Sequence, residues 1–366
     1  MNNSDLLYQL AIGRVPHIGH ITTRTLLEHF ETAEAIFKAP LKVLQAIEGL
    51  GTVRARAIRN FKDFARCEKE LAFITHNNID AISIKDKAYP HKLRFCPDAP
   101  PLLFFKGKAD LNAHKTIAII GTRSNSEYGA HCCRQLIEGI APHAPIVVSG
   151  MAYGIDIIAH KTAIQNQLPT IGVVAHGLDS IYPAAHKATA MQAMQNGGLL
   201  SEYFSETPPD KQNFPMRNRI VAGLCDVTIV IETGIKGGSI ITAELANGYN
   251  RDVAAFPGRS SDTRSAGCNY LIRKNKAALI TCADDLADLM GWNITPVPKK
   301  VQKQLFVQLN PYEQKIFDQL CEGAALHVAE LASRGQMSYS TAMTAMLNME
   351  MHGMLECMPG NLYKLS

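Results

Sequence analysis

Short apolar runs alternate with segments of helical periodicity through the middle of the chain. The runs rich in Val, Ile and Leu predict strands at Thr116–Ile120, Ile146–Ser149, Thr170–Ala175, Leu199–Tyr203, Val227–Glu232, Val253–Phe256 and Ala278–Ile280. Between them, apolar residues recur three or four positions apart, as in Tyr128–Ile140, Ile155–Ile164 and Ile240–Tyr249. Nearly continuous apolar strands that alternate with helices are typical of a parallel sheet covered on both faces. Residues 79–290 are therefore predicted to form an α/β domain, with one or two extra strands within Ile79–Lys108.

The first 75 residues show a different pattern, that of short helices joined by tight turns. Two turns, Val15–His20 and Ile47–Gly51, each precede a helix-like segment, and several Arg and Lys residues follow the second turn. This order resembles a pair of helix-hairpin-helix motifs, which bind the DNA backbone without reading its sequence. A packing or partner-binding module with a solvated basic face explains the pattern equally well. Residues 1–75 are thus predicted to be a helical domain that contacts either DNA or protein.

The last part of the chain, residues 305–366, follows a linker predicted at 291–304. Its pattern predicts three short helices and a small hairpin, which is the order of a winged-helix domain; the helices are expected at Pro311–Cys321, Val328–Ser333 and Ser338–Met349. The third helix, where a DNA reader carries basic residues, contains no Lys or Arg. Its methionines suit an adaptable protein-contact surface or a simple core. A protein-contact role is therefore favoured.

Composition narrows the class of protein. The chain has 366 residues, 46% hydrophobic and 19% charged, which suits two or three globular domains. No apolar run approaches the roughly 18 residues of a membrane helix, and the N-terminus lacks a secretory pattern. Nine cysteines without a C-x-x-C pair indicate reduced thiols, and the histidines form no metal set. We expect a cytoplasmic protein without a membrane anchor, a metal or another cofactor.

Charge is distributed unevenly among these regions. Residues 1–114 hold 16 basic and 12 acidic residues, residues 115–290 hold 15 of each, and residues 305–366 hold 3 basic and 6 acidic residues. The linker adds three lysines and no acid. A neutral domain can still present a local basic face, because the fold decides where charges gather. The acidic C-terminal domain is harder to interpret as a nucleic-acid binder.

Small or glycine-rich turns follow several predicted strands and carry basic neighbours. Four segments stand out: Gly121-Thr122-Arg123, Ser149–Asp156, Arg217-Asn218-Arg219 and Lys236–Ser239. The carboxyl ends of parallel strands lie at one edge of a sheet, where helix N-termini and glycine amides favour anions. The predicted ligand is therefore a chain or cluster of phosphates. No dinucleotide fingerprint, P-loop or nucleophile elbow occurs. Asp156 and His160 lie four apart and could form a catalytic dyad, but a capping Asp and a packed His are the favoured interpretation.

A longer series of motifs carries a resemblance to a known family. In order, the series reads Tyr89-Pro90, Pro100-Pro101, Leu103-Phe104, Lys106-Gly107, Gly121-Thr122-Arg123, Ser149-Gly150, Gly154-Ile155-Asp156, Ala159-His160, Gly177-Leu178-Asp179, Tyr182-Pro183, Ser201-Glu202-Tyr203, Phe214-Pro215, Arg217–Ile220, Gly238-Ser239, Thr242-Ala243, Phe256-Pro257-Gly258, Gly267-Cys268-Asn269 and Leu271-Ile272. This series resembles the DNA-processing protein A family, DprA or Smf, with a Rossmann-like central domain. One departure is Lys274-Asn275-Lys276, where the family usually has a Gly-Ala pair.

The resemblance implies a function as well as a fold. Members of that family bind incoming single-stranded DNA during natural transformation, form homodimers, and load the RecA recombinase onto DNA coated with single-strand binding protein. They have no enzymatic step. A groove that follows the DNA backbone with little sequence readout agrees with the phosphate site expected from the turns.

Carried over by motif, the resemblance also implies site residues. The implied DNA contacts are Gly121, Arg123, Ser149, Gly150, Lys187, Arg217, Asn218, Arg219, Lys236 and Gly238. Arg123 and Arg217 are the strongest candidates among them. Arg219 has an alternative role in a structural ion pair with Glu202 or Glu232. The implied dimer face contains Leu271 and Ile272, next to the departure at Lys274–Lys276.

The rival hypothesis is an enzyme. The segment from Gly237-Gly238 to Glu244 resembles the signature of nucleoside-monophosphate phosphoribohydrolases, in which a glycine-rich turn holds the nucleotide phosphate and a glutamate takes part in cleavage of the glycosidic bond. The Gly-Thr step of that signature is missing here. Release of free base from nucleoside monophosphates would favour this enzyme over DNA binding.

Overall fold

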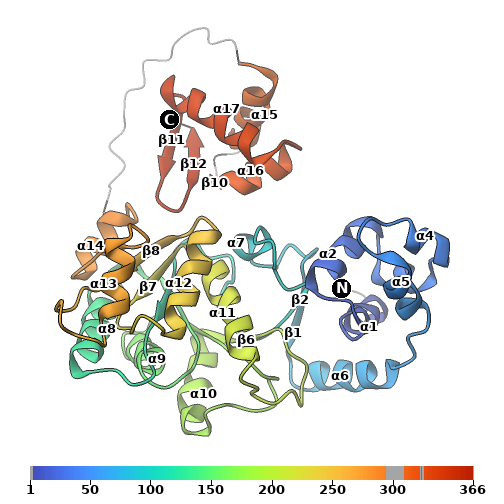
Figure 1. Ribbon diagram of the computed structural model, residues 1–366, viewed down its shortest axis with the longest axis horizontal. Helices are drawn as coiled ribbons and strands as arrows, with labels where there is room; N and C mark the ends of the chain where they lie inside the picture. The colour runs from blue at the N-terminus through green and yellow to red at the C-terminus, as the bar shows by residue number, and fades with distance from the viewer. Residues whose placement is uncertain (1–2, 294–308, 322, 324, 366) are drawn as a thin grey trace.

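The computed structural model describes residues 3–293, 309–321, 323 and 325–365 (Figure 1). Its first part is a cluster of six helices: α1 (Asn3–Ile12), α2 (His20–His29), α3 (Ala33–Lys38), α4 (Leu41–Gln45), α5 (Gly51–Arg59) and α6 (Phe64–His76). Both predicted turns fall between helices, one before α2 and one before α5. Gly49 and Gly51 in the second turn have positive φ angles of 77° and 67°, a region that glycine adopts without strain. The prediction of an N-terminal helical region is confirmed.

A nine-stranded sheet forms the centre of the molecule. Its strands are β1 (Asp80–Ser83), β2 (Leu102–Gly107), β3 (Thr116–Ile120), β4 (Ile146–Ser149), β5 (Thr170–Val173), β6 (Gly198–Ser201), β7 (Val227–Val230), β8 (Asp252–Ala255) and β9 (Ala278–Leu279). They lie in the order β1-β2-β6-β5-β4-β3-β7-β8-β9. The seven strands from β6 to β9 are parallel, whereas β1 and β2 are antiparallel additions at one edge. The expected mainly parallel sheet is confirmed.

Helices cover both faces of this sheet, and every residue of its central strands β3, β4, β5 and β7 is buried. All five residues of β3 are buried; Ile117 and Ile119 pack on one face, and Ala118 and Ile120 on the other. The first face is covered by α8 (Glu127–Ile140), α9 (Ile155–Gln165) and α14 (Ala283–Leu289). The second is covered by α11 (Asn213–Leu224), α12 (Gly238–Gly248) and α13 (Ala266–Arg273). The short α7 (His91–Arg94) and α10 (Lys187–Asn196) complete the domain.

The helical region is fixed to the sheet domain by buried polar contacts as well as apolar ones. The carboxylate of Glu70 on α6 accepts hydrogen bonds from the Ser205 amide at 2.9 Å and the Ser205 hydroxyl at 2.5 Å. Arg66 donates to both Glu70, at 2.8 Å, and the Ser205 carbonyl, at 2.5 Å. Glu70 is almost fully buried, so these bonds replace the water that its carboxylate loses on folding.

The C-terminal part is a separate small fold with its own apolar core. It contains α15 (Pro311–Leu320), β10 (Leu326–His327), α16 (Val328–Arg334), α17 (Tyr339–Met351), β11 (Leu355–Met358) and β12 (Leu362–Leu365). These three helices and the hairpin confirm the winged-helix prediction. The hairpin turn contacts the sheet domain: the Gly360 amide donates to Asp252 at 2.9 Å, and the Asn361 side chain donates to the Asn250 carbonyl at 2.9 Å. Most of the predicted linker at 291–304 lies outside the described residues.

The structure corrects the expectation that Leu271 and Ile272 form an exposed dimer face. Leu271, on α13, is 0% exposed and belongs to the core that α11 and α12 also line. Ile272 is only half-buried, and it packs against the same core from outside. Adjacent helical residues point about 100° apart, so one of the two faces inward and cannot meet a partner.

Within the described ranges, no helix is both long and apolar enough to cross a bilayer.

Candidate nucleic-acid interface

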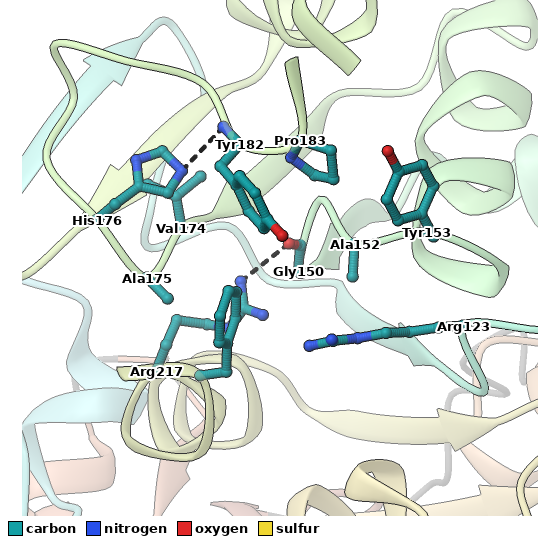
Figure 2. A pocket seen from close by; sticks show the side chains of 11 residues that line it. Arg123, Gly150, Ala152, Tyr153, Val174, Ala175, His176, Tyr182, Pro183 and Arg217 are labelled. Carbon is teal, nitrogen blue, oxygen red and sulfur yellow. Dashed lines mark hydrogen bonds between the residues drawn. The ribbon is translucent and has the colours of Figure 1, made fainter. Parts of the chain in front are cut away.

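A small cavity of about 30 Å³ opens beside the carboxyl ends of β4 and β5 (Figure 2). The residues that line it come from the turns after β3, β4 and β5 and from α11. They are Arg123, Gly150, Ala152, Tyr153, Val174, Ala175, His176, Tyr182, Pro183, Phe214 and Arg217. The structure therefore brings together Arg123, Gly150 and Arg217, three of the predicted site residues, at the edge of the sheet where the parallel topology placed them.

Arg123 is the exposed cation of this cavity. It lies on the turn after β3 and points toward Arg217 (Figure 2), and its guanidinium carbon is 5.1 Å from the centre of the Phe214 ring. Stacking on the ring restricts the orientation of the guanidinium plane. An arginine held in this way is ready to bind a phosphate or to stack on a base.

Arg217 forms the floor of the cavity and is 4% exposed. Its Nη1 donates to the Gly150 carbonyl at 2.9 Å and also to the Val173 carbonyl, which ties together the ends of β4 and β5. Burial lowers the pKa of Arg217, and the nearby Asp156 carboxylate raises it. The guanidinium still carries its charge, because an arginine does not deprotonate in a protein. Arg217 therefore shapes the cavity and supplies positive potential from beneath it.

Gly150 is required by this packing. A Cβ at that position would lie 2.6 Å from Arg217 Nη2 and 2.6 Å from Asp156 Oδ2, closer than real contacts allow. The glycine thus admits the two charged groups to either side of the chain at the end of β4. The Ser149-Gly150 motif therefore requires a glycine here because Arg217 packs against it.

The Asp156–His160 pair is not a catalytic dyad in this arrangement. Burial raises the pKa of Asp156, which accepts a hydrogen bond from the Ala152 amide at 3.4 Å. His160 is fully buried and its Nδ1 pairs with the Thr170 hydroxyl at 2.7 Å. Burial lowers the pKa of His160 to about 3, so its ring is neutral. Each side chain is committed to the packing of α9 rather than to the other.

Aromatic rings are the part of the site that sequence reasoning missed. The rings of Tyr182 and Phe214 lie 6.1 Å apart with an interplanar angle of 49°. Tyr153 is 51% exposed and packs edge-on against His186 at 4.8 Å. The signal was present in the sequence, since Tyr182-Pro183 and Phe214-Pro215 lie beside the basic motifs. Exposed rings around an arginine are suited to stacking on unpaired bases.

The remaining predicted residues lie outside the cavity. Lys187, the first residue of α10, Lys236, in the turn before α12, and Gly238, the first residue of α12, are exposed at the same edge of the sheet. Asn218 accepts a hydrogen bond from Arg217 Nε at 3.3 Å, so it supports the arginine. The buried Ser149 hydroxyl donates to the Ile119 carbonyl at 2.6 Å and is directed away from any ligand.

Arg219 is buried away from the cavity, so the expectation that it contacts phosphate is wrong. Arg219 is 3% exposed, and its Nη2 donates to Glu202 Oε2 at 2.5 Å. This is the ion pair that the sequence left open as an alternative. We therefore exclude Arg219 from the binding residues.

Glu232 takes the place that an anion would occupy in the first turn. Its carboxylate accepts hydrogen bonds from the Ser126 amide at 2.7 Å and the Ser126 hydroxyl at 2.6 Å, at the start of α8. A Cβ on Gly129 would lie 2.6 Å from the same carboxylate. Gly121, in the turn before α8, packs closely on Ile155. The N-terminus of α8 is thus neutralised internally, and the cavity lies beside β4 and β5 instead.

Glu244 does not support the rival enzyme. It is exposed on α12 and pairs with Lys276 at 2.9 Å, after the end of α13. That pairing directs the carboxylate away from the Gly237-Gly238 turn, two helical turns earlier. Among the described residues, no group of three or more His, Cys, Asp or Glu side chains could hold a metal ion.

Family models match all three parts of the chain. The model of the DNA recombination-mediator protein A family covers residues 80–291, a helix-hairpin-helix model covers residues 5–68, and a DprA winged-helix model covers residues 304–361. A recombination mediator is a DNA-binding protein and not an enzyme, so the prediction that the chain is not an enzyme is confirmed.

Similar individual proteins carry names of the same family. The chain is 42% identical over 206 residues to DNA processing protein DprA of Streptococcus pneumoniae, covering 56% of this chain and 72% of that protein. It is 30% identical over 319 residues to Protein Smf of Escherichia coli, covering 85% and 84%. It is 33% identical over 299 residues to Protein Smf of Synechocystis, covering 80% and 74%.

Solved structures show the same fold. The X-ray structure of DNA processing protein A from Streptococcus pneumoniae superposes with a TM-score of 0.67 at 33% identity, over 79% of this chain and 98% of that one. A structure of DNA processing protein A from Helicobacter pylori, which concerns its single-stranded DNA binding mode, superposes with a TM-score of 0.54 at 30% identity, over 60% of this chain and 99% of that one. On these grounds the chain belongs to the DNA recombination-mediator protein A family, whose named members are DprA and Smf proteins.

Proposed function

We propose that this protein binds single-stranded DNA at the carboxyl edge of its parallel sheet. The observation that carries the proposal is the exposed Arg123 guanidinium stacked on Phe214 at the mouth of a cavity lined by further aromatic rings. A relative from Helicobacter pylori is described by its single-stranded DNA binding mode, which supports the same ligand here.

The chemistry of the edge favours a single strand over a duplex. Arg123, Lys187 and Lys236 are exposed in the segments that follow β3, β5 and β7, at one edge of the sheet, and would contact a phosphate backbone. Tyr182, Phe214 and the exposed Tyr153 need open base faces, which a duplex hides in its stack. Binding should therefore depend strongly on salt and weakly on sequence.

The test is a titration of labelled single- and double-stranded oligonucleotides by fluorescence anisotropy over a salt series. Arg123→Ala should weaken single-strand binding about tenfold or less, and lower the salt slope by about one unit. Arg273→Ala is the matched control, because Arg273 is an exposed arginine at the far end of α13. Equal affinities for the wild type and Arg123→Ala, with the control unchanged, would reject this site.

We further propose that the bound strand is incoming DNA in natural transformation, that the protein protects it in the cytoplasm, and that it loads RecA onto strands coated with single-strand binding protein. Its membership of a recombination-mediator family supports this role. Strand exchange by RecA on coated single strands should accelerate when the protein is added, and Arg123→Ala should reduce that effect. A rate that does not change on addition would contradict the loading role.

Homodimerisation is also part of the proposal. With Leu271 in the core, Ile272 is the member of the predicted pair that can reach a partner. Ile272→Glu should shift the mass measured by light scattering from dimer to monomer, whereas a dimer that persists would place the interface elsewhere.

A further inference from the structure

Two tight turns hold the winged-helix domain against the amino edge of the sheet, where Figure 1 shows the hairpin of β11 and β12 pointing toward β8. At the turn between α12 and β8, the Asn250 side chain donates to the Tyr339 hydroxyl at 3.2 Å. The Asn250 carbonyl accepts from the Asn361 side chain at 2.9 Å, at the turn between β11 and β12. Beside it, the Gly360 amide donates to Asp252 at 2.9 Å. These three hydrogen bonds form the docking contact between the two domains.

The backbone of both turns is preformed for this contact. Asn250 and Asn361 are in the left-handed region, with φ angles of 56° and 53°, and Gly360 has a φ angle of 83°. Asparagine and glycine are among the residues that adopt this region most readily. The docking contact is therefore made by turns whose shape is fixed locally, so its opening requires neither turn to refold.

Charge also favours docking. The winged-helix segment, residues 305–366, holds 3 basic and 6 acidic residues. On the amino edge, Arg251 is 5% exposed and donates to the Lys92 carbonyl at 2.8 Å. Burial, together with the charges of Arg251 and Lys92, lowers the pKa of His327 on β10 to about 3. The His327 ring is thus neutral and does not repel these two cations, which attract the acidic domain as a whole.

The docking contact engages the part of a winged-helix domain that recognises other molecules. The third helix of such a domain, here α17, is the one that lies against the ligand in DNA-binding members. Tyr339 is its first residue, and Gly360 and Asn361 form the turn of the hairpin that follows it. The sheet domain therefore covers one end of this recognition surface.

An exposed apolar stripe runs along the outer face of α17. It consists of Tyr339, Met343, Leu347 and Met351, which are between 37% and 78% exposed. Residues four apart lie one above another on a helix, so the four side chains form one continuous surface. The inward face, with Ala345, Met346 and Met349, belongs to the core of the domain. Tyr339 is thus part of both the stripe and the docking contact.

The stripe has the chemistry of a protein-binding surface. No charged residue occurs from Ser338 to Met349, so this part of the helix offers no cation to phosphates. The three basic side chains of the domain are engaged inside it: Lys315 donates to the Gly335 carbonyl at 3.2 Å, Arg334 pairs with Glu330, and Lys364 pairs with Glu356 at 3.2 Å.

One carboxylate at the far end of the stripe is unmatched. Glu350, in the last turn of α17, has no ion pair in the part of the chain that the structure describes. A negative charge there opposes the helix dipole, so a cation beside it is favoured. A partner that matches both features is an amphipathic helix with an apolar face and a Lys or Arg next to it.

We propose that the docking contact is autoinhibitory. Docked, the sheet domain holds the Tyr339 end of the stripe and the adjacent hairpin turn. Released, the whole stripe binds a basic amphipathic helix of a partner protein. The strength of partner binding then depends on the fraction of molecules in which the docking contact is open.

The first experiment opens the docking contact without touching the core of the domain. In the open variant, Asn250→Gly and Asn361→Gly together remove both side-chain donors, while glycine keeps the left-handed backbone. The matched control combines Asn78→Gly with Asn275→Gly. These two exposed asparagines are also left-handed, with φ angles of 50° and 54°, and no hydrogen bond joins them to the winged-helix domain among the described residues.

The readout is hydrogen exchange at the Gly360 amide, whose own bond to Asp252 the substitutions leave in place. We expect this exchange to accelerate about fivefold or more in the open variant and not in the control, since each lost hydrogen bond favours opening by about twofold to tenfold. Amides of residues 344–350, in the middle of α17, should keep their protection. If they lose it, Tyr339→Phe, which removes only the hydroxyl, takes the place of the open variant. Exchange at Gly360 that keeps the wild-type rate while α17 stays protected would overturn the proposal.

The second experiment measures binding of a fluorescein-labelled synthetic helix of leucines and lysines by anisotropy. The open variant should bind this helix about fivefold or more tighter than the wild type and the control, because more molecules have a free stripe. Adding Leu347→Ser to the open variant should remove that gain, since Leu347 is 56% exposed within the stripe. Equal affinity of the wild type and the open variant for the helix would contradict autoinhibition.

Oligonucleotides separate this proposal from the proposed function. The open variant should bind single strands as the wild type does, because Asn250 and Asn361 lie at the amino edge of the sheet, away from the cavity lined by Arg123 and Arg217. If it instead gained affinity for single- or double-stranded DNA, the covered surface would be a nucleic-acid site. The autoinhibited protein contact would then be wrong, while DNA binding at the carboxyl edge would stand.

Discussion

Replacing Gly150 by alanine tests the packing on which the proposed DNA site depends. The added Cβ would lie 2.6 Å from Arg217 Nη2, 2.9 Å from Arg217 Cζ and 2.6 Å from Asp156 Oδ2. Arg217 is held by two backbone carbonyls and is 4% exposed, so it has no free space in which to move aside. The substitution must therefore displace the guanidinium from at least one of its two carbonyl partners.

The magnitude follows from those partners. A hydrogen bond from a charged group contributes about 1.5–3 kcal/mol, and partial relaxation of the loop recovers some of it. We expect Gly150→Ala to lower stability by about 2–4 kcal/mol, which for a domain of this size corresponds to a fall in Tm of roughly 5–15 °C. Single-strand affinity should also fall, by on the order of tenfold, because the displaced Arg217 no longer supports the cavity.

The assay compares thermal unfolding and oligonucleotide binding of Gly150→Ala with those of Gly248→Ala. Gly248 is the last residue of α12, away from the carboxyl edge of the sheet, and a Cβ there meets no atom within 4 Å. The control should change Tm by only about 1–3 °C in either direction, since its added methyl group faces open space. If Gly150→Ala unfolds at the wild-type temperature, the inferred packing of Arg217 against Gly150 is wrong.

Further predictions concern other parts of the chain. Burial raises the pKa of Glu202 to about 7, so its carboxyl holds a proton in the folded state between about pH 4.5 and pH 7. The wild type should then lose stability relative to Glu202→Gln as pH rises through that window, by about 3 kcal/mol at most, measured as a difference in Tm at pH 5 and pH 8. Leu271→Glu should prevent folding or cost more than about 4 kcal/mol in chemical denaturation, because it puts a charge into a fully buried position; a folded variant would contradict the core assignment. Deleting residues 305–366 should leave single-strand affinity within a few-fold, since this acidic segment has few cations to offer phosphates; a large loss by anisotropy would refute that charge argument.

Much of the fold was accessible from the sequence, because apolar runs and helical periodicity report burial directly. The bounds of β3 and β4 match the predicted runs to the residue, and the other parallel strands differ by at most two residues at either end. The antiparallel direction of β2 relative to the rest of the sheet could not be predicted from the sequence. Antiparallel pairing of β2 with β6 joins residues about one hundred positions apart, and no local pattern encodes that contact.

The site was predicted in part. Arg123 lies beside the cavity because its turn follows a buried strand, and its contact with DNA stays a prediction. Arg217 and Arg219 could not both face one ligand, because they lie two apart on α11 and helical residues at that spacing point to different sides. The sequence contained that information once the segment was taken as a helix. The role of Glu232 was not predictable, since its carboxylate meets Ser126 from 106 residues away.

The position of the winged-helix domain has a consequence for how DNA would enter and leave the proposed site. Its hairpin turn contacts Asn250 and Asp252, at the amino end of β8, whereas the cavity lined by Arg123 and Arg217 opens at the carboxyl ends of β4 and β5. The length of the strands therefore separates that cavity from the contact with the winged-helix domain. In the proposed function, a DNA strand would bind or leave at one edge of the sheet without displacing the winged-helix domain at the other, so the two need not compete for the same space.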